Sequence, residues 1–176
     1  MVNYRRNRIP GGTFFFTVTL KDRHSHLLVE QIDALREAFR IVGRQLPFRV
    51  EAIVVLPEHL HAVWTLPPSD DDFPSRWKAI KSRFTAMVRK GGMSLSCNAK
   101  GEHLLWQRRY WEHTIRDDHD LHRHVDYIHY NPVKHGLVSR VVDWPFSSFH
   151  RYVRLGWLTP DWGGAEAVGQ ESEFGE

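Results

Sequence analysis

The chain has 176 residues, which is enough for one domain with a buried core and short for two. Hydrophobic residues make up 41% of the chain and charged residues 26%, as in ordinary globular proteins, which excludes a disordered or fibrous chain. No apolar run approaches the ~20 residues that span a bilayer. The N-terminus has no apolar core of a signal peptide, and Cys97 is the only cysteine, so we expect a cytoplasmic protein without membrane segments or disulfides.

Basic residues are unevenly distributed along the chain. The net charge is only +3, but residues 161–176 hold five acidic residues and no Lys or Arg, so the remainder is more basic than the total suggests. Residues 76–116 alone contain ten Lys or Arg against two Glu. Such an imbalance is typical of a protein that binds a polyanion, although a solvated basic surface would have the same composition.

Hydrophobic periodicity and turn residues predict the first half of the fold. In chain order they predict a strand at 13–20, a helix at 27–46 closed by Pro47, a strand at 48–56, a turn at Pro57-Glu58, a second strand at 59–66, a loop at 67–74 and a helix at 75–90 with Ser75 as its N-cap. The two strands joined by the Pro57-Glu58 turn form an antiparallel hairpin.

The second half begins with residues 91–103, whose turn composition predicts a mobile loop. A strand at 104–115, a helix at 118–131 capped by Asp117 or Asp118 and limited by Pro132, and a short helix at 146–153 follow. This order predicts an α+β fold, with helices packed on an antiparallel or mixed sheet. We expect one domain over residues 1–163, and a disordered acidic tail over 164–176.

His59, Leu60 and His61 form the sharpest local feature. Alternate residues of a strand project to the same face about 6.6 Å apart, so both imidazoles can bind one metal ion at nitrogen distances of ~2.0 to 2.2 Å. Leu60 then points to the opposite face and enters the core. Because the chain has 12 histidines, such a triplet can also arise without any ligand role.

Two histidines leave a metal site incomplete, so a third protein ligand is expected. Tyr127 and Asn131 stand four residues apart and share one face of the 118–131 helix, with Asn131 at its end because Pro132 follows. Tyr127 would be the nucleophile: its hydroxyl, with a pKa near ~10, would be helped by a cation that polarises a phosphate. A tyrosine that merely covers the core is the alternative. Tyr130 competes on the same helix, but no ligand stands four residues beyond it.

The sequence is also compatible with a reaction other than attack by a tyrosine. No GxSxG elbow or phosphate-binding glycine loop is present. Glu58, next to His59, could act as a general base for an activated water, which would make the protein a metal-dependent phosphodiesterase.

The segments PEHLH (57–61), WQRRYWEHTIRDD (106–118) and DYIHYNPVKHG (126–136) resemble the REP-associated tyrosine transposases, bacterial relatives of the HUH single-strand transposases. The likeness runs from YRRNRIPGG near the N-terminus through WPFSSFHRYV (144–153) to DWGG (161–164). The histidine pair is shared with replication initiators and relaxases, whereas DYIHYNPVKHG is characteristic of this transposase group.

The resemblance implies an HUH endonuclease fold, a central antiparallel sheet in a ferredoxin-like or RRM-like arrangement. It implies that His59, His61 and Asn131 hold Mg²⁺ or Mn²⁺ and that Tyr127 is the nucleophile. Attack would give a 5′-phosphotyrosine link and a free 3′-hydroxyl. The implied substrates are single-stranded DNA hairpins of repetitive extragenic palindromes, met at the bacterial nucleoid. A DNA-binding regulator that has lost catalysis is the remaining alternative.

The basic residues would serve this DNA. Residues expected to contact it are Arg5, Arg6 and Arg8 at the hairpin foot, and Lys78, Lys81, Arg83, Arg108, Arg109 and Lys134 along the phosphates. Members of this branch often act as monomers, and the sequence itself does not decide between monomer and dimer. Residues 91–103 look longer than the connection expected from the family.

Overall fold

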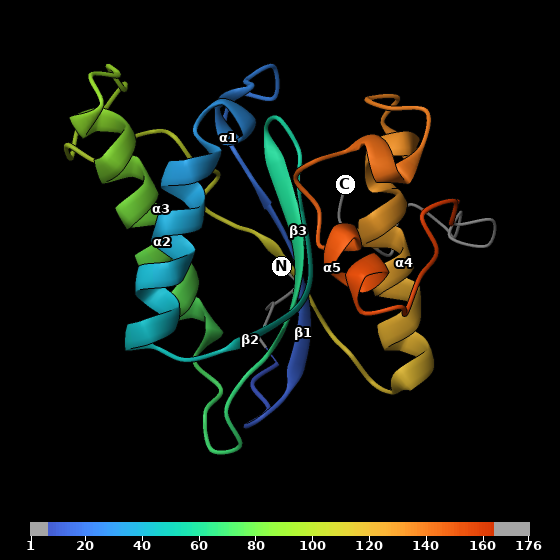
Figure 1. The fold of residues 1–176 in the computed structure, drawn as a ribbon. Coiled ribbons are helices and arrows are strands. Elements are labelled where there is room, and N and C mark those ends of the chain that lie inside the picture. Colours follow the sequence, from blue (N-terminus) through green and yellow to red (C-terminus); the bar gives the residue numbers. More distant parts are fainter. Residues whose placement is uncertain (1–6, 164–176) are drawn as a thin grey trace, which may run out of the picture.

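A four-stranded antiparallel sheet lies between two layers of helices in the computed structural model, which describes residues 7–163 (Figure 1). The elements are β1 (Thr13–Thr19), α1 (Leu27–Glu30), α2 (Ile32–Gln45), β2 (Arg49–Val55), β3 (His59–Thr65), α3 (Phe73–Lys90), β4 (Trp111–Thr114), α4 (Asp118–Lys134), the 3₁₀ helix η1 (Val141–Asp143) and α5 (Phe149–Arg154). The strand order β2-β3-β1-β4 is that of a ferredoxin-like sheet. The expected α+β class is confirmed.

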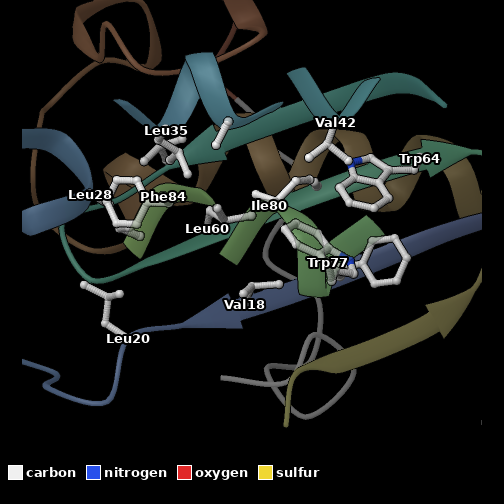
Figure 2. Packing of buried hydrophobic residues seen from close by; sticks show 14 of the residues in the cluster. Val18, Leu20, Leu28, Leu35, Val42, Leu60, Trp64, Trp77, Ile80 and Phe84 are labelled. Carbon is white, nitrogen blue, oxygen red and sulfur yellow. The ribbon is translucent and has the colours of Figure 1, made fainter. Parts of the chain in front are cut away.

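One face of the sheet carries the larger hydrophobic core. Side chains of β1 alternate, so Phe14, Phe16 and Val18 pack against the α2 and α3 layer. Figure 2 shows this core, in which the Trp64 and Trp77 rings stack with their centroids 4.1 Å apart. Burial of each Leu or Phe here contributes about 1.5–3 kcal/mol, so this layer fixes the sheet on which the other face is built.

The opposite face of the sheet is covered by α4, with α5 beside it (Figure 1). A smaller cluster joins the two, and it includes Phe15 of β1, Val54 of β2, Val63 of β3 and Ile128 of α4. This packing presents one side of α4 to the middle strands. The side chains on that side of α4 therefore contact the residues of β1 and β3 that point away from the larger core.

Helix α4 continues past Pro132, contrary to the expectation that this proline limits it. Proline removes one N–H and crowds the preceding turn, and only Val133 and Lys134 follow it before the helix ends. The end is a Schellman motif: Gly136, with φ +67°, donates to the Val133 carbonyl, and the Leu137 N–H donates to the Pro132 carbonyl at 2.9 Å. The extension keeps Lys134 within the helix.

Helix starts and breaks also differ from the predictions. The helix expected at 27–46 is two helices, because the backbone at Gln31 (φ −110°, ψ 33°) departs from helical geometry. Helix α3 begins at Phe73, and its N-cap is Asp72, whose carboxylate accepts the Ser75 N–H at 3.2 Å. Ser75 is therefore inside the helix, and its assignment as N-cap was wrong.

The last strand is shorter than predicted. Of residues 104–115, only Trp111–Thr114 form β4, while the preceding residues run beside β1 with a single bridge between Leu20 and Trp106. Residues 91–103 are mainly turns, with one bridge between Cys97 and His103. Helix α5 spans Phe149–Arg154, and the segment before it pairs Ser147 with Val54, covering the outer edge of β2.

The expected tail at 164–176 lies outside the described residues. Within residues 7–163, no helix is both long and apolar enough to cross a bilayer.

Candidate active site

Strand β3 places the two histidines on the face covered by α4. His59 and His61 are 1% and 0% exposed, and Leu60 between them enters the core on the other face, as predicted. The two imidazole centroids are 4.9 Å apart, and the ring planes meet at 81°. Rings at nearly right angles can each direct one nitrogen to a shared ion.

Neighbouring side chains hold the Nδ1 atoms of both histidines. Thr17 Oγ1 lies 2.8 Å from His61 Nδ1, across the β1–β3 pair in which these two residues are opposite each other. Glu58 Oε1 lies 2.8 Å from His59 Nδ1. Burial alone would raise the pKa of Glu58, but the contact with His59 outweighs burial and lowers the pKa. The carboxylate is therefore ionised and accepts a hydrogen bond from the Nδ1–H group of His59. The His59 lone pair is then on Nε2, the tautomer that a metal requires.

Helix α4 brings Tyr127 against this pair. The Tyr127 ring centroid is 5.3 Å from that of His61 and 6.1 Å from that of Phe15, and the residue is only 3% exposed. Its packing on Phe15 agrees with the alternative role of covering the core. Its contact with His61, however, places the ring on the face of the sheet that carries His59 and His61.

The Lys134 side chain approaches the hydroxyl of Tyr127. Its Nζ donates to the Tyr127 hydroxyl at 3.3 Å and lies 5.1 Å from the ring centroid. The sequence reasoning assigned Lys134 to DNA phosphates and did not connect it with Tyr127. Their separation of seven residues, two helical turns, was the available signal. Tyr130, the competing tyrosine, instead lines a cavity with Arg140 and Trp162.

Asn131 lies one turn after Tyr127 on the same side of α4 and is fully buried. Two imidazole nitrogens and one carboxamide oxygen would form a mixed donor set that leaves positions open for a phosphate oxygen. Together with the right-angled rings and the held Nδ1 atoms, this set fits a divalent cation.

A small cavity adjoins His59. Its volume is about 270 Å³, and its lining includes Arg23, His24, His26, Glu58, His59 and His135. The His135 ring centroid is 5.3 Å from that of His59. The Arg23 guanidinium and the imidazoles of His24, His26 and His135 offer N–H donors in this cavity, which a phosphate group approaching the histidine pair can accept.

A second histidine cluster joins β4 to the start of α4. His113, Asp120 and His124 have possible ligand atoms within 4.8 Å of one another. The two imidazole planes lie 14° apart with centroids at 4.7 Å, so these rings are stacked, whereas the rings of His59 and His61 meet at 81°.

Asp120 ties β4 and the residues that follow it to the start of α4. Its Oδ2 accepts from His113 Nε2 at 2.8 Å and from the Arg116 N–H at 3.0 Å, and its backbone carbonyl lies 2.8 Å from His124 Nδ1. Burial would raise the pKa of Asp120, but these donors hold it at about 2. The sequence reasoning missed this cluster, although Asp120 and His124 stand four apart on one helix.

Most of the predicted DNA-contacting residues lie away from Tyr127. Arg5 and Arg6 are outside the described residues, and Arg8 lies 3.7 Å from Asp71.

Helix α3, on the opposite face of the sheet, carries Lys78, Lys81 and Arg83. Lys81 Nζ donates to the Gln107 carbonyl at 2.8 Å, and Arg83 donates to Gln45. Arg108 and Arg109 are exposed just before β4. Among the predicted DNA-contacting residues that the structure describes, only Lys134 reaches the site itself.

The sheet order, the histidine pair on its central strand and the facing helix-borne tyrosine define a class of enzyme. The family described as "Transposase IS200 like" matches residues 13–131, which include the whole sheet and α4 as far as Asn131. The class is therefore that of the IS200-like transposases, which cut and rejoin DNA.

Closer relatives narrow the class. The chain is 52% identical to a REP-associated tyrosine transposase of Escherichia coli, with 93% of this chain and 92% of the relative covered. A relative from Haemophilus influenzae with the same family name is 45% identical over 93% of this chain and 94% of its own length. A solved structure of a REP-associated tyrosine transposase bound to a REP hairpin is 48% identical, covers 100% of this chain and 98% of its own, and superposes with a TM-score of 0.87. The chain belongs to the REP-associated tyrosine transposases.

Proposed function

We propose that this protein cuts and rejoins single-stranded DNA at REP-type palindromic hairpins, with Tyr127 as nucleophile and with His59, His61 and Asn131 holding Mg²⁺ or Mn²⁺. The observation that carries the proposal is the 5.3 Å approach of the Tyr127 ring to the His61 ring, in a chain of this family. The hairpin substrate is inferred from the relative that was solved bound to a REP hairpin.

The reaction exchanges one phosphate ester for another. The Tyr127 oxygen loses its proton and bonds to the phosphorus, the bond from phosphorus to the 3′-oxygen breaks, and that oxygen takes up a proton. The product is a 5′-phosphotyrosine and a free 3′-hydroxyl. Attack by another 3′-hydroxyl reverses these steps and joins a new strand, so neither water nor a nucleotide is consumed.

The residues of the chain supply orientation and charge. His59 and His61, held at Nδ1 by Glu58 and Thr17, and Asn131 would bind the divalent cation. When bound, that cation polarises the scissile phosphate and stabilises the charge developing on it. The Lys134 ammonium lies next to the oxygen that becomes the phenolate.

The enclosed position of Tyr127 has a consequence for DNA binding. With the tyrosine 3% exposed, the cavity beside His59 is the opening through which the scissile phosphate would approach the residues that would hold the cation, and Lys134 would have to move before the phosphorus meets the hydroxyl. We expect the DNA to draw Lys134 partly towards itself. Work on chromosomal hairpins would take place at the bacterial nucleoid, and a monomer suffices because Tyr127 and the three ligands come from one chain.

Product analysis tests the proposal. The protein is incubated with Mg²⁺ or Mn²⁺ and an end-labelled hairpin strand from the DNA flanking its gene, and products are separated under denaturing conditions. We expect a covalent protein–DNA adduct on the 5′-phosphate side and a free 3′-hydroxyl fragment. Tight hairpin binding without cleavage in any metal would contradict the proposal and favour a DNA-binding regulator.

The hydrolase alternative predicts free 5′-phosphate ends and no adduct at any time. Against it, the Glu58 carboxylate already accepts from His59 and lies 3.7 Å from Arg23. A carboxylate engaged in this way orients an imidazole, which is a different role from that of a base for water.

A further inference from the structure

The sheet register places one exposed tryptophan in line with the proposed metal site. In β1, Thr17 lies opposite His61 of β3 on one side and opposite Trp111 of β4 on the other. Directly opposite residues of antiparallel strands project to the same face. Trp111, Thr17 and His61 therefore form a row on the face that carries Tyr127.

Independent contacts support this assignment of faces. His113, two residues after Trp111 and thus on the same face, stacks on His124 of α4. Tyr110, one residue before, contacts Phe16 and Trp77 in the core of the other face. The Thr17 hydroxyl itself bonds to His61.

Trp111 is exposed although it lies on the covered face of the sheet. Helix α4 packs mainly over β2 and β3, and β4 is at the far edge, so the Trp111 side chain remains 43% exposed. A single exposed tryptophan is common on a protein surface, so the distinguishing feature of Trp111 is its place in the row with Thr17 and His61, which leaves an accessible indole beside the proposed metal site. The exposed Arg109 lies two residues before Trp111 and supplies the charge that phosphates require, whereas Arg108, three residues before it, pairs with Glu102 at 3.1 Å.

We propose that Trp111 is a stacking platform for a base of the single-stranded DNA. Adjacent strands lie about 4.8 Å apart, so Trp111 stands about 10 Å from His61 across the sheet. At about 3.4 Å per stacked nucleotide, this is roughly one to three nucleotides from the phosphate at the metal site. The proposal rests on the proposed function and deepens it: the base stacked on Trp111 sets which phosphate faces Tyr127.

Stacking on an aromatic ring does not depend strongly on base identity, because every base has a π-face. Trp111 is therefore a positioning residue, and it acts by fixing the strand rather than by reading its sequence. The other use of an exposed aromatic residue on an edge strand is pairing with a second copy of the chain. The test separates the two.

The experiment measures binding without metal, in EDTA, so that cleavage does not contribute. The probes are a hairpin strand from the DNA flanking the gene and versions that lack a single base at each position beside the hairpin foot. They are titrated against the wild-type protein and against Trp111→Ala, Trp111→Phe and Trp157→Ala. Trp157 is 65% exposed and follows α5, so it is a matched control for loss of a surface indole.

For the wild type, we expect removal of one particular base to weaken binding roughly 5- to 100-fold, the range of base–aromatic stacking. Trp111→Ala should bind the intact strand that much more weakly and lose nothing further at that position. Trp111→Phe should be intermediate, and Trp157→Ala should match the wild type. Cleavage by Trp111→Ala should also spread to neighbouring phosphates.

Equal affinity of Trp111→Ala and wild type for all strands would overturn the proposal. So would losses from Trp111→Ala and base removal that multiply at every position, or a change of sedimentation that shows a broken dimer. The proposed function fails separately, if the wild type shows the base-specific loss but forms no adduct.

Discussion

The Lys134 ammonium lies 3.3 Å from the Tyr127 hydroxyl, two turns further along α4. The contact exists because the helix continues through Pro132 and ends only at the Gly136 turn. A cation at this position stabilises the negative charge on the oxygen during attack, and it stabilises the tyrosine oxygen again as a leaving group in the reverse step. We therefore expect Lys134 to act as a catalytic side chain as well as a DNA-binding one.

Substitution Lys134→Met should slow adduct formation about 10- to 100-fold, because one charged hydrogen-bond partner of the reacting oxygen is lost. Single-turnover kinetics at saturating hairpin measure this rate, and Lys134→Arg should recover part of it. If Lys134 served only a phosphate, the rate at saturation would be unchanged, and only the salt dependence of binding would fall.

Substitution Glu58→Gln should weaken the apparent metal affinity about 10- to 100-fold, since a partner that orients a liganding imidazole is removed. Adduct yield as a function of Mn²⁺ concentration measures the effect. Saturating Mn²⁺ should restore the rate to near that of the wild type. A rate that stays low at every metal concentration would instead support Glu58 as a base.

Removal of the metal should stop cleavage but leave binding intact. We expect EDTA, or the substitution His61→Ala at any metal concentration, to abolish the adduct with less than a few-fold change in hairpin affinity, because the phosphates are mainly bound by Lys and Arg. Thr17→Val, which removes only the hydroxyl at His61 Nδ1, should shift the Mn²⁺ requirement about tenfold upward. Full activity of His61→Ala would refute this ligand assignment.

Asp120 should stabilise the fold over a defined pH range. Its pKa is about 2 in the folded protein against 3.8 ordinarily, so its contribution is present above about pH 4 and is lost as the pH falls towards 2. This shift corresponds to about 2 kcal/mol. Asp120→Asn should therefore lower the free energy of unfolding by about that amount at pH 7, with the difference shrinking below pH 4, as measured by urea unfolding.

Asp118→Asn, at an exposed carboxylate in the same helical turn, is the matched control. It should change the unfolding free energy by less than about 0.5 kcal/mol. A difference in unfolding free energy between Asp120→Asn and wild type that is small, or that grows as the pH falls, would show that Asp120 does not stabilise the fold through its charge.

The parts of the fold with strong local periodicity were predictable from the sequence. The Pro57-Glu58 turn and the alternation around His59 and His61 predicted the hairpin correctly, because a turn and a two-residue period fix which side chains share a face. The ends of the helices and strands were less predictable. The end of α4 depends on Gly136 and on packing against the sheet, and these outweigh the local effect of Pro132.

The site was predictable in part for the same reason. Helical spacing placed Tyr127 and Asn131 together, whereas the approach of Tyr127 to His61 depends on how α4 docks on β2 and β3, which no local pattern specifies. The row from His61 to Trp111 likewise depends on β4 pairing with β1, a contact between residues about a hundred positions apart in the chain. The roles of the individual residues remain predictions.

The most direct measurement is the location of the covalent link. After reaction with a hairpin strand and Mn²⁺, the protein is digested with nuclease and protease, and mass spectrometry identifies the peptide that carries the nucleotide. We predict the nucleotide on Tyr127, full adduct formation by Tyr130→Phe and none by Tyr127→Phe. A nucleotide on another residue, or an adduct from Tyr127→Phe at the wild-type rate, would contradict the assignment of Tyr127 as the nucleophile.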